Sequence, residues 1–247
     1  MSKQATEASS NPLAEAAGTT ASPPALSASW RRSLFVGRAR LLTTLAVGLA
    51  VLVYALDLTV VSTAAPTIIG EFHDQELFGW LFAAYSVPVA ATTLLYGRLG
   101  DVYGCKRPFS AALLGFLAAS VACGFATSMA QLIAFRVLQG LCAGAIFPLS
   151  IAIIASVYPI EQRARGFSVV PSAFAFASVL GPTAGGFITA ALGWRWIFFL
   201  NIPIVLIALT VLTLVYHERQ APRRLTLRDI DMLVLQRYLA RLTCSDR

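Results

Sequence analysis

The stretch GRLGDVYGCKRP, residues 97–108, lies between two long apolar runs and packs charge, three glycines and a closing proline into a short connection. A connection this short must turn tightly, and glycine permits the turn because it adopts positive φ without strain. The charged residues cannot follow the apolar runs into a nonpolar environment, so they are expected at its boundary. The nature of that environment follows from the rest of the chain.

The composition identifies lipid as the solvent for most of the chain. Hydrophobic residues make up 57% of the 247 residues and charged residues 13%, whereas a soluble domain carries roughly 25% charged residues. The net charge of +7 does not indicate nucleic acid as a partner, because the basic residues lie in the gaps between apolar runs, as in membrane proteins. The expected surroundings are therefore a lipid bilayer, with no nucleic acid.

Six apolar runs reach the length of about 20 residues that a helix needs to cross a bilayer. Runs of this length exclude the shorter strands of a membrane barrel. The sequence thus predicts an all-α membrane protein with spans at Leu41–Ala64, Phe78–Leu99, Phe109–Ala126, Gln131–Ser156, Phe167–Leu192 and Trp196–Tyr216.

The gaps between these runs predict the orientation of the chain. Basic residues gather before the first span and after the second, fourth and sixth spans, whereas the gap after the first span carries only acidic charges. The gap after the fifth span carries Arg195 alone. Because basic gaps face the cytoplasm, both termini and residues 97–108 are expected on the cytoplasmic side, with the plasma membrane as the expected location.

Three regions are predicted along the chain. Residues 1–40 are expected to be a disordered cytoplasmic tail that ends in a basic anchor, because they are rich in Ala, Ser, Thr and Pro. Residues 41–216 form the six-helix region. Residues 217–247 are too polar to span and are interpreted as a truncated or misread seventh-helix region, with a cytoplasmic amphipathic helix as the alternative.

An internal repeat relates the two halves of the six-helix region. Gly97, Gly104 and Lys106 have the spacing of Gly186, Gly193 and Arg195, shifted by 89 residues. The same shift carries the first span to about the start of the fourth, and the second span to the fifth. Since three helices reverse the orientation, the sequence predicts a 3+3 inverted repeat, the plan of secondary transporter folds.

Several motifs carry a resemblance to a known family. GRLGDVYGCKRP resembles the loop between helices 2 and 3 of the major facilitator superfamily, although Cys105 stands where a basic residue is usual. LDLTVVSTAAPTI (56–68), RVLQGLCAGA (136–145) and GPTAGG (181–186) resemble the signatures of helices 1, 4 and 5 in the drug:proton antiporter branch with fourteen spans, of the fungal multidrug and toxin efflux type. The chain resembles the N-terminal six-helix half of such a carrier.

The resemblance implies proton-coupled efflux of small drug-like or secondary-metabolite molecules by alternating access. It implies that the loop with Gly97, Asp101, Gly104, Lys106 and Arg107 acts as a cytoplasmic gate, with a plain surface turn as the alternative. It also implies that the helix 5 signature bends and seals the closed state, with tight packing alone as the alternative. The residues of that signature are Gly181, Pro182, Gly185 and Gly186.

Two charged residues lie inside predicted spans. A carboxylate in a bilayer costs about 2.5–3.5 kcal/mol on insertion scales, so Asp57 is a candidate for proton binding. Asp57 and Arg136 are both expected roughly 8–11 Å below the outer surface at 1.5 Å per residue. They could therefore face each other across the bundle, with Gln139 nearly one turn from Arg136. The hypothesis is that Arg136 tunes protonation of Asp57; the alternatives are a structural carboxylate and an arginine that snorkels to the interface.

Other classes of function fit the sequence less well than proton-coupled transport. No cofactor or metal is expected, since the four cysteines lack metal-ligand spacing, and the proton gradient would supply the energy. An enzyme is not expected, because no cluster of nucleophile, base and metal ligands exists. A transport-inactive half that persists as a membrane interaction protein or gene-model fragment stays open, as do sugar and siderophore carriers. Transport would require a homodimer or the missing C-terminal half.

Overall fold

The computed structural model describes residues 26–216, with side chains from residue 37 onward. All regular elements within this range are helical. The predicted tail at residues 217–247 and the first 25 residues of the predicted N-terminal tail lie outside the described residues. The elements are α1 (Leu26–Phe72), η2 (Gln75–Leu77), α2 (Phe78–Tyr103), α3 (Lys106–Gly124), α4 (Met129–Ala143), α5 (Ile146–Val157), η3 (Ile160–Gln162), α6 (Arg163–Phe167), α7 (Val169–Leu192) and α8 (Arg195–Val215).

Six helical stretches in this range are long and apolar enough to cross a membrane, which confirms the predicted fold class. The fourth stretch combines α4 and α5, and the fifth combines η3, α6 and α7. The boundaries differ from prediction by a few residues at most ends. The six stretches are Gly37–Phe72, Gln75–Tyr103, Lys106–Gly124, Met129–Val157, Ile160–Leu192 and Arg195–Val215.

The first helix begins earlier than the sequence predicts. A tail was expected up to residue 40, whereas α1 begins at Leu26. The helix therefore starts just after Pro23 and Pro24, the last prolines before Pro66. Leu, Ala and Arg, which favour helix, are frequent between residues 26 and 40, so nothing in the local sequence stops the helix there.

Two predicted helices are interrupted, each four residues before a proline. The helix of the fourth span breaks between Ala143 and Ile146, and Pro148 lacks the N–H that would bond to the carbonyl of Gly144. The short helix α6 ends at Phe167, and Pro171 lacks the corresponding N–H. A missing i to i−4 hydrogen bond weakens a helix at that turn, so both breaks have the same local cause.

Glycines on α4 allow a close approach to α2. A Cβ atom at Gly140 would collide with the backbone carbonyl of Tyr85, and one at Gly144 would collide with Thr92. The two glycines are four residues apart, Gly140 within α4 and Gly144 directly after its last residue, so they lie about one turn apart. They form the small-residue pattern that lets two membrane helices pack with their backbones close together.

A second pair of glycines does the same between α7 and α1. A Cβ atom at Gly181 would collide with Thr59, and one at Gly185 would lie 2.5 Å from the hydroxyl of Thr63. Thr92 and Gly181 are 89 residues apart, the shift of the repeat. A threonine on α2 thus meets a glycine at the end of α4, and a glycine on α7 meets a threonine on α1.

The ends of α2 and α7 adopt the same backbone conformation. Gly104 follows α2 with φ 82° and ψ 162°, and Gly193 follows α7 with φ 93° and ψ 159°. These two are the only glycines with positive φ among the described residues. Only glycine adopts this region without strain, which is why the sequence carries glycine at both equivalent positions of the repeat.

The basic residue two positions after each of these glycines binds the far end of the partner helix. Lys106 Nζ, at the start of α3, donates to the Thr213 carbonyl in the last turn of α8, at 2.9 Å. Arg195, at the start of α8, donates to the Ala126 carbonyl just past the end of α3, at 3.2 Å. Such carbonyls have no helical partner, so each basic residue caps the other helix. We call these two contacts the reciprocal caps.

The loop at 97–108 is shorter than predicted. Helix α2 continues to Tyr103, so Gly97 and Asp101 are helical and the connection consists of Gly104 and Cys105. In the sequence, Asp101 lies close to the basic residues Lys106 and Arg107. Within residues 39–216 the ion pairs are Arg136–Asp57 and Arg195–Glu71, and Asp101 takes part in neither. Lys106 instead binds α8, because helix continuation carries Asp101 into the last turn of α2.

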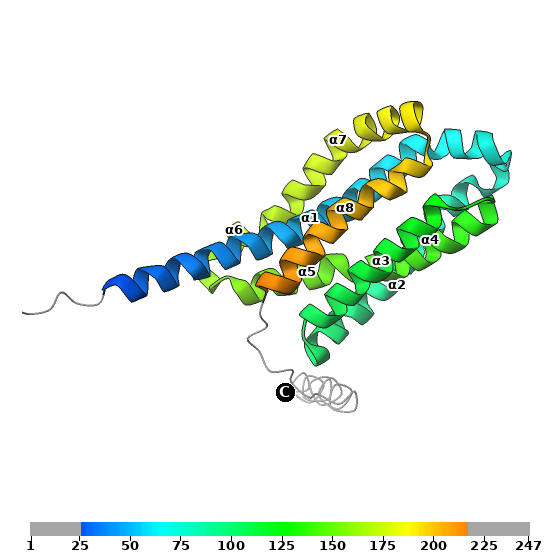
Figure 1. Cartoon of the computed structure of the whole chain (residues 1–247). Coiled ribbons are helices and arrows are strands. Elements are labelled where there is room, and N and C mark those ends of the chain that lie inside the picture. The colour runs from blue at the N-terminus through cyan, green and yellow to red at the C-terminus, as the bar shows by residue number, and fades with distance from the viewer. Residues whose placement is uncertain (1–25, 217–247) are drawn as a thin grey trace, which may run out of the picture. The chain divides into compact units, whose positions relative to one another are not determined.

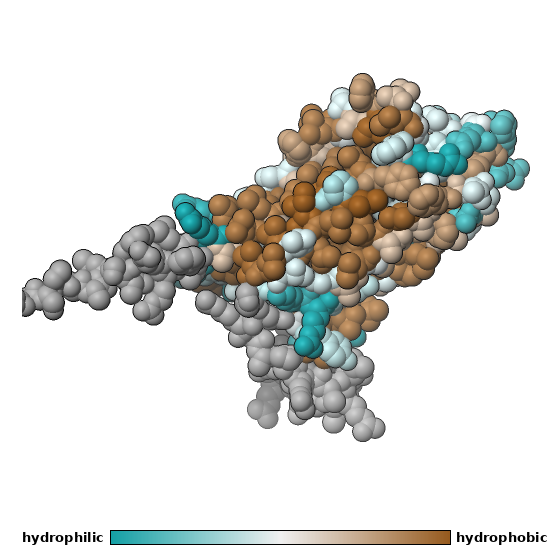
Figure 2. Space-filling view, viewed as in Figure 1, coloured by the Kyte–Doolittle hydropathy of each residue, from teal (hydrophilic) through white to brown (hydrophobic). Residues whose placement is uncertain are grey.

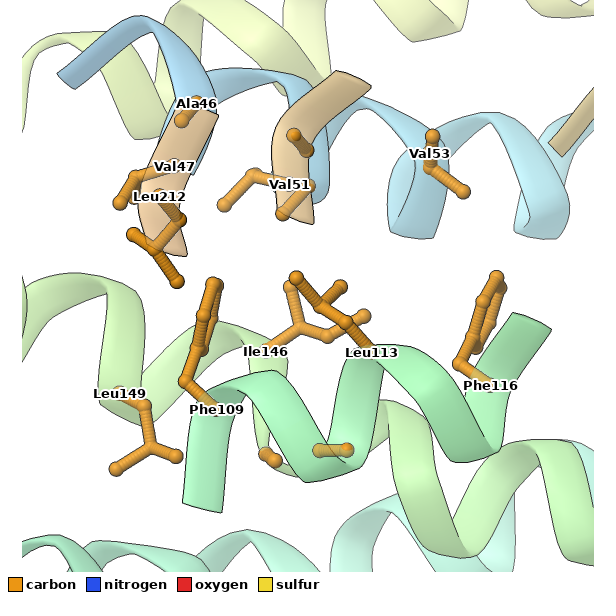
Figure 3. Packing of buried hydrophobic residues seen from close by; sticks show 14 of the residues in the cluster. Ala46, Val47, Val51, Val53, Phe109, Leu113, Phe116, Ile146, Leu149 and Leu212 are labelled. Atoms are coloured by element: carbon orange, nitrogen blue, oxygen red, sulfur yellow. The ribbon is translucent and has the colours of Figure 1, made fainter. Parts of the chain in front are cut away.

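The interior at the end of the bundle near the reciprocal cap of Lys106 is filled by large apolar side chains. Figure 3 shows Phe109, Leu113 and Phe116 of α3 pointing toward residues of α1 and α8, with Ile146 and Leu149 of α5 beside them. These residues are fully buried. In Figure 1, α8 runs beside α1, and α2, α3 and α4 lie together. The α3–α8 contact thus joins the two groups of helices.

The outer surface is largely apolar. The face shown in Figure 2 is brown along the length of the helices, with polar residues gathered toward their ends. The second and fifth spans are the most exposed, with 17% of their most apolar windows buried inside the structure. Their exposed residues include Trp80, Leu94, Phe176 and Phe187. Since water does not solvate such a surface favourably, it suits lipid or a further apolar partner.

The close approach of α7 and α1 gives a direct prediction. In Gly181→Ala the new methyl would lie 2.7 Å from the Thr59 Cβ, so the helices must separate, at a cost of about 1–3 kcal/mol for overpacking. We expect a lower melting temperature for the purified chain in detergent, measured by circular dichroism.

Gly186→Ala is the matched control, because no atom lies within 4 Å of a Cβ at Gly186. Its melting temperature should equal or exceed that of the native chain, since alanine favours helix more than glycine does. Equal melting of the two variants would contradict the packing described here.

Candidate functional site

A buried ion pair joins α1 to α4. Arg136 Nη1 donates to Asp57 Oδ2 at 2.6 Å, and the two side chains are 1% and 0% exposed. The sequence predicts that these residues could face each other, and the structure brings them together. Their role in proton binding stays a prediction, which the geometry alone does not test.

Gln139 bridges the two charges from the next turn of α4. Its Oε1 accepts from Arg136 Nη1 at 2.9 Å, and its Nε2 donates to Asp57 Oδ1 at 3.2 Å. The orientation of the amide follows from chemistry, since guanidinium only donates and carboxylate only accepts. The thiol of Cys123 on α3 also donates to Gln139 Oε1, at 3.8 Å. The spacing of Arg136 and Gln139 at i and i+3 places both on one face of the helix.

Two further polar residues extend the cluster to α8 and α3. Asn201 Nδ2 donates to Asp57 Oδ1 at 3.4 Å and to Ser120 Oγ at 3.1 Å. Ser120 Oγ in turn donates to the Phe198 carbonyl at 3.0 Å. Neither residue is among the site residues predicted from the sequence. The available signal was Asn201 itself, a polar residue within the apolar run of the sixth span.

Aromatic rings enclose the guanidinium group. The Arg136 Cζ lies 4.2 Å from the centre of the Tyr85 ring of α2, and 6.0 Å from that of Phe198. A cation over an aromatic face gains roughly 2 kcal/mol or more when desolvated. Tyr85 is 1% exposed, so this attraction replaces part of the hydration that Arg136 loses. We call Asp57, Arg136, Gln139, Asn201, Ser120 and Tyr85 the polar cluster.

Among the described residues, the hydrogen-bond partners of the Asp57 carboxylate are all donors. Arg136, Gln139 and Asn201 donate three bonds to its two oxygens. A carboxylate accepts all three, whereas a protonated carboxyl group must itself donate one bond and would face only donors. The observed arrangement therefore fits the charged form of Asp57, and taking up a proton requires at least one partner to turn or withdraw.

The other predicted site residues lie in two places. The helix 5 signature packs on α1 beside Thr59 and Thr63, with Gly181 and Gly185 buried and Pro182 and Gly186 exposed. The predicted gate residues Gly97, Asp101, Gly104, Lys106 and Arg107 lie at the junction of α2 and α3. Asp57 instead has its hydrogen bonds and ion pair with Arg136, Gln139 and Asn201.

A second, more exposed cluster surrounds the end of α1. Glu71 accepts from Trp194 Nε1 at 2.6 Å and from Arg195 Nη1 at 2.8 Å. The Arg195 guanidinium also stacks on Trp194, with Cζ 4.4 Å from the ring centre. The side chains of Arg195 and Glu71 are 39% and 43% exposed, so solvent weakens this ion pair. The cluster ties α1 to the reciprocal cap made by Arg195.

The comparisons with known proteins match this architecture. The family model described as Major Facilitator Superfamily matches residues 47–240. Multidrug resistance protein 3 of Bacillus subtilis is 38% identical over 176 residues, which are 71% of this chain and 34% of the relative. Efflux pump roqT of Penicillium rubens is 32% identical over 206 residues, 81% of this chain and 38% of the relative.

Solved structures show the same fold. The proton:xylose symporter XylE matches with a TM-score of 0.64 at 20% identity, over 76% of this chain and 46% of that one. The human organic anion transporter MFSD10 matches with a TM-score of 0.63 at 21% identity, over 77% of this chain and 52% of that one. At such identities the likeness extends to the fold alone.

The chain therefore belongs to the major facilitator superfamily, whose members are multi-pass membrane transporters and not enzymes. This confirms the family predicted from the motifs. The matching segments cover 34% and 38% of the two relatives named above, so the chain spans roughly a third of their length.

The buried ion pair predicts a non-additive effect on stability. Arg136→Met should cost about 3–5 kcal/mol, because it leaves the Asp57 carboxylate buried without its countercharge. Adding Asp57→Asn removes that unpaired charge, so the double variant should recover a large part of the loss. Thermal unfolding of the four proteins in lipid nanodiscs measures the coupling.

A double variant that melts at the temperature given by adding the two single losses would contradict a direct interaction between these residues. The exposed pair provides the control. The same cycle on Glu71→Gln and Arg195→Met should show a coupling of at most about 1 kcal/mol, as for other solvent-exposed ion pairs.

Proposed function

We propose that this chain forms the N-terminal six-helix part of a two-half carrier that exports small drug-like or secondary-metabolite molecules in exchange for protons. The observation that carries the proposal is the buried Asp57 carboxylate, which is held by donors from α4 and α8. A transporter driven by protons needs a group whose protonation changes the contacts between helices. Asp57 meets this requirement, because its charged form is the one that its three partners can all bind.

The proposed coupling step begins with proton uptake by Asp57. The neutral carboxyl group no longer attracts Arg136, and its new O–H faces donors only. Arg136 keeps Gln139 and the Tyr85 ring as partners, so the guanidinium stays with α4 and α2 when the contact to α1 weakens. Movement between α1 and α4 would then accompany loading and unloading of the proton. Alternating access in carriers of this kind is a rocking of packed helices around a fixed site.

Export is favoured over uptake by the names of the relatives. The similar proteins include a multidrug resistance protein and several efflux pumps. A sugar as cargo gains no support from the xylose symporter structures, since 20% identity bears on the fold alone.

We also propose the orientation and the mechanical roles. The basic gaps favour cytoplasmic termini in the plasma membrane. The junction of α2 and α3 would then lie at the cytoplasmic face, where Lys106 and its neighbours would form part of a gate. The contact of Gly181 and Gly185 with α1 would seal the closed state near Asp57.

The carrier would be completed by a second six-helix half, supplied by another segment or by a second copy of this chain. The second and fifth spans are the most exposed and apolar, which fits their burial against such a partner. The observation fits a membrane interaction protein equally well, so a transport measurement is needed to separate the two functions.

The proposal is tested with a hybrid carrier in which residues 1–216 replace the matching segment of the Bacillus subtilis relative. We expect cells that produce the hybrid to export a fluorescent cationic dye, and export to stop when a protonophore removes the proton gradient. Asp57→Asn should reduce gradient-driven export at least tenfold, because the residue then binds no exchangeable proton.

Glu161→Gln is the matched control, since Glu161 is an exposed carboxylate outside the polar cluster. Its export should equal that of the unmodified hybrid. Gradient-driven export that survives Asp57→Asn unchanged would refute Asp57 as the coupling group. A hybrid that reaches the membrane but exports nothing would favour the interaction protein.

A further inference from the structure

Asn201 connects the ion pair to a part of the bundle that the coupling step does not otherwise involve. It lies on α8, is 3% exposed, and donates both to Asp57 Oδ1 and to Ser120 Oγ of α3. Ser120 is 0% exposed and donates to the Phe198 carbonyl one turn before Asn201. The hydroxyl of Ser120 thus gives its hydrogen to α8 and receives one from α8.

The orientation of the Asn201 amide is fixed by these contacts. Because Ser120 uses its hydrogen on the Phe198 carbonyl, only a donor can approach its lone pairs, and the Asp57 carboxylate likewise accepts only a donor. Both hydrogens of Asn201 Nδ2 are therefore engaged. The amide cannot turn over without losing both bonds, so Ser120 holds the side chain in the orientation that supports a charged Asp57.

Helices α3 and α8, which carry Ser120 and Asn201, are joined at three places along their length. The reciprocal caps bind α3 to α8 at both ends, through Lys106 to Thr213 and Arg195 to Ala126. Ser120 and Asn201 bind them in the middle. Because α3 and α8 are held together at these places, Asn201 keeps its donor in a fixed position while α1 and α4 move.

We propose that Asn201, held by Ser120, is a positioning residue that stabilises the charged form of Asp57 and thereby sets the pH at which it takes up a proton. This rests on the proposed function in treating Asp57 as the group that binds the proton. Loss of a hydrogen bond to a charged group favours the neutral form. Removing Asn201 should therefore let Asp57 bind its proton at higher pH.

Four other titratable groups interact electrostatically with Asp57. They are Arg136 on α4, Tyr85 on α2, Cys123 on α3 and Tyr54 on α1. Helices α5 and α7 carry no titratable side chain, and that of α8, Arg195, is bound to Glu71. The variants proposed below leave all of these groups in place, so a change in protonation reports on Asn201.

The test is infrared titration of the purified 247-residue chain in lipid nanodiscs. The band of the protonated Asp57 carboxyl group is identified by its loss in Asp57→Asn, and its intensity is followed against pH. We expect Asn201→Leu to move the midpoint upward by about one pH unit, as for the loss of one hydrogen bond to a charged group. Ser120→Ala should move it in the same direction by less, because Asn201 remains but is no longer held.

Ser150→Ala is the matched control, since Ser150 is buried on α5 and its hydroxyl has no hydrogen-bond partner. Its midpoint should equal that of the native chain. Unmoved midpoints in both Asn201→Leu and Ser120→Ala would overturn the proposal. If Asn201→Leu does not fold, the midpoint of Ser120→Ala decides alone, a rise supporting the role and no change overturning it.

The infrared midpoint tests the role of Asn201, whereas export by the hybrid carrier tests the proposed function. A shifted midpoint together with a hybrid carrier that exports without proton coupling would contradict the proposed function and support the role of Asn201. A hybrid carrier whose export depends on the proton gradient, together with an unmoved midpoint, would support the proposed function and contradict the role of Asn201. If Asp57→Asn removes no band at any pH, Asp57 takes up no proton, and both are overturned.

Discussion

The negative charge of Asp57 is the constraint on which the centre of this structure depends. A carboxylate buried among helices must find donors, and here they come from Arg136, Gln139 and Asn201. These residues lie on α4 and α8, so the charge determines how three spans meet. A buried ion pair is a weak source of net stability, because desolvation offsets much of the attraction. We propose that its role in this fold is to make these contacts sensitive to a single proton.

The other helix contacts limit where a change in the protonation of Asp57 can alter the packing. Glycines hold α1 against α7 and α2 against α4, and the reciprocal caps hold α3 to α8 at both ends. Each of these contacts has a counterpart in the other half of the repeat, at positions shifted by 89 residues or by a similar number. The inverted repeat thus supplies paired supports, whereas the Asp57–Arg136 contact has no equivalent in the other half of the repeat, where Ile146 stands 89 residues after Asp57.

Much of this arrangement could be predicted from the sequence. Hydrophobic runs gave the six spans, the glycine and lysine spacing gave the repeat, and the cost of burying charge singled out Asp57 and Arg136. Asn201 and Ser120 were missed because small polar residues are common in membrane helices, and only packing shows which of them face the interior. The breaks in the fourth and fifth spans were missed because Pro148 and Pro171 interrupt a helix, whereas Pro88 and Pro182 lie inside continuous ones. The end of α2 could not be predicted, because Gly97, Gly100 and Gly104 could each have ended the helix. The helix ends before Gly104, so Asp101 is part of it.

We propose that protonation of Asp57 loosens the contact between α1 and α4. Electron paramagnetic resonance distances between spin labels on Thr67, in the last turns of α1, and Ala130, in the first turn of α4, measure this directly in lipid nanodiscs. Both positions are exposed, so the labels leave the polar cluster intact. The distance should change as the pH falls in the native chain and should not depend on pH in Asp57→Asn. The same pH-dependent change in both proteins would contradict the account.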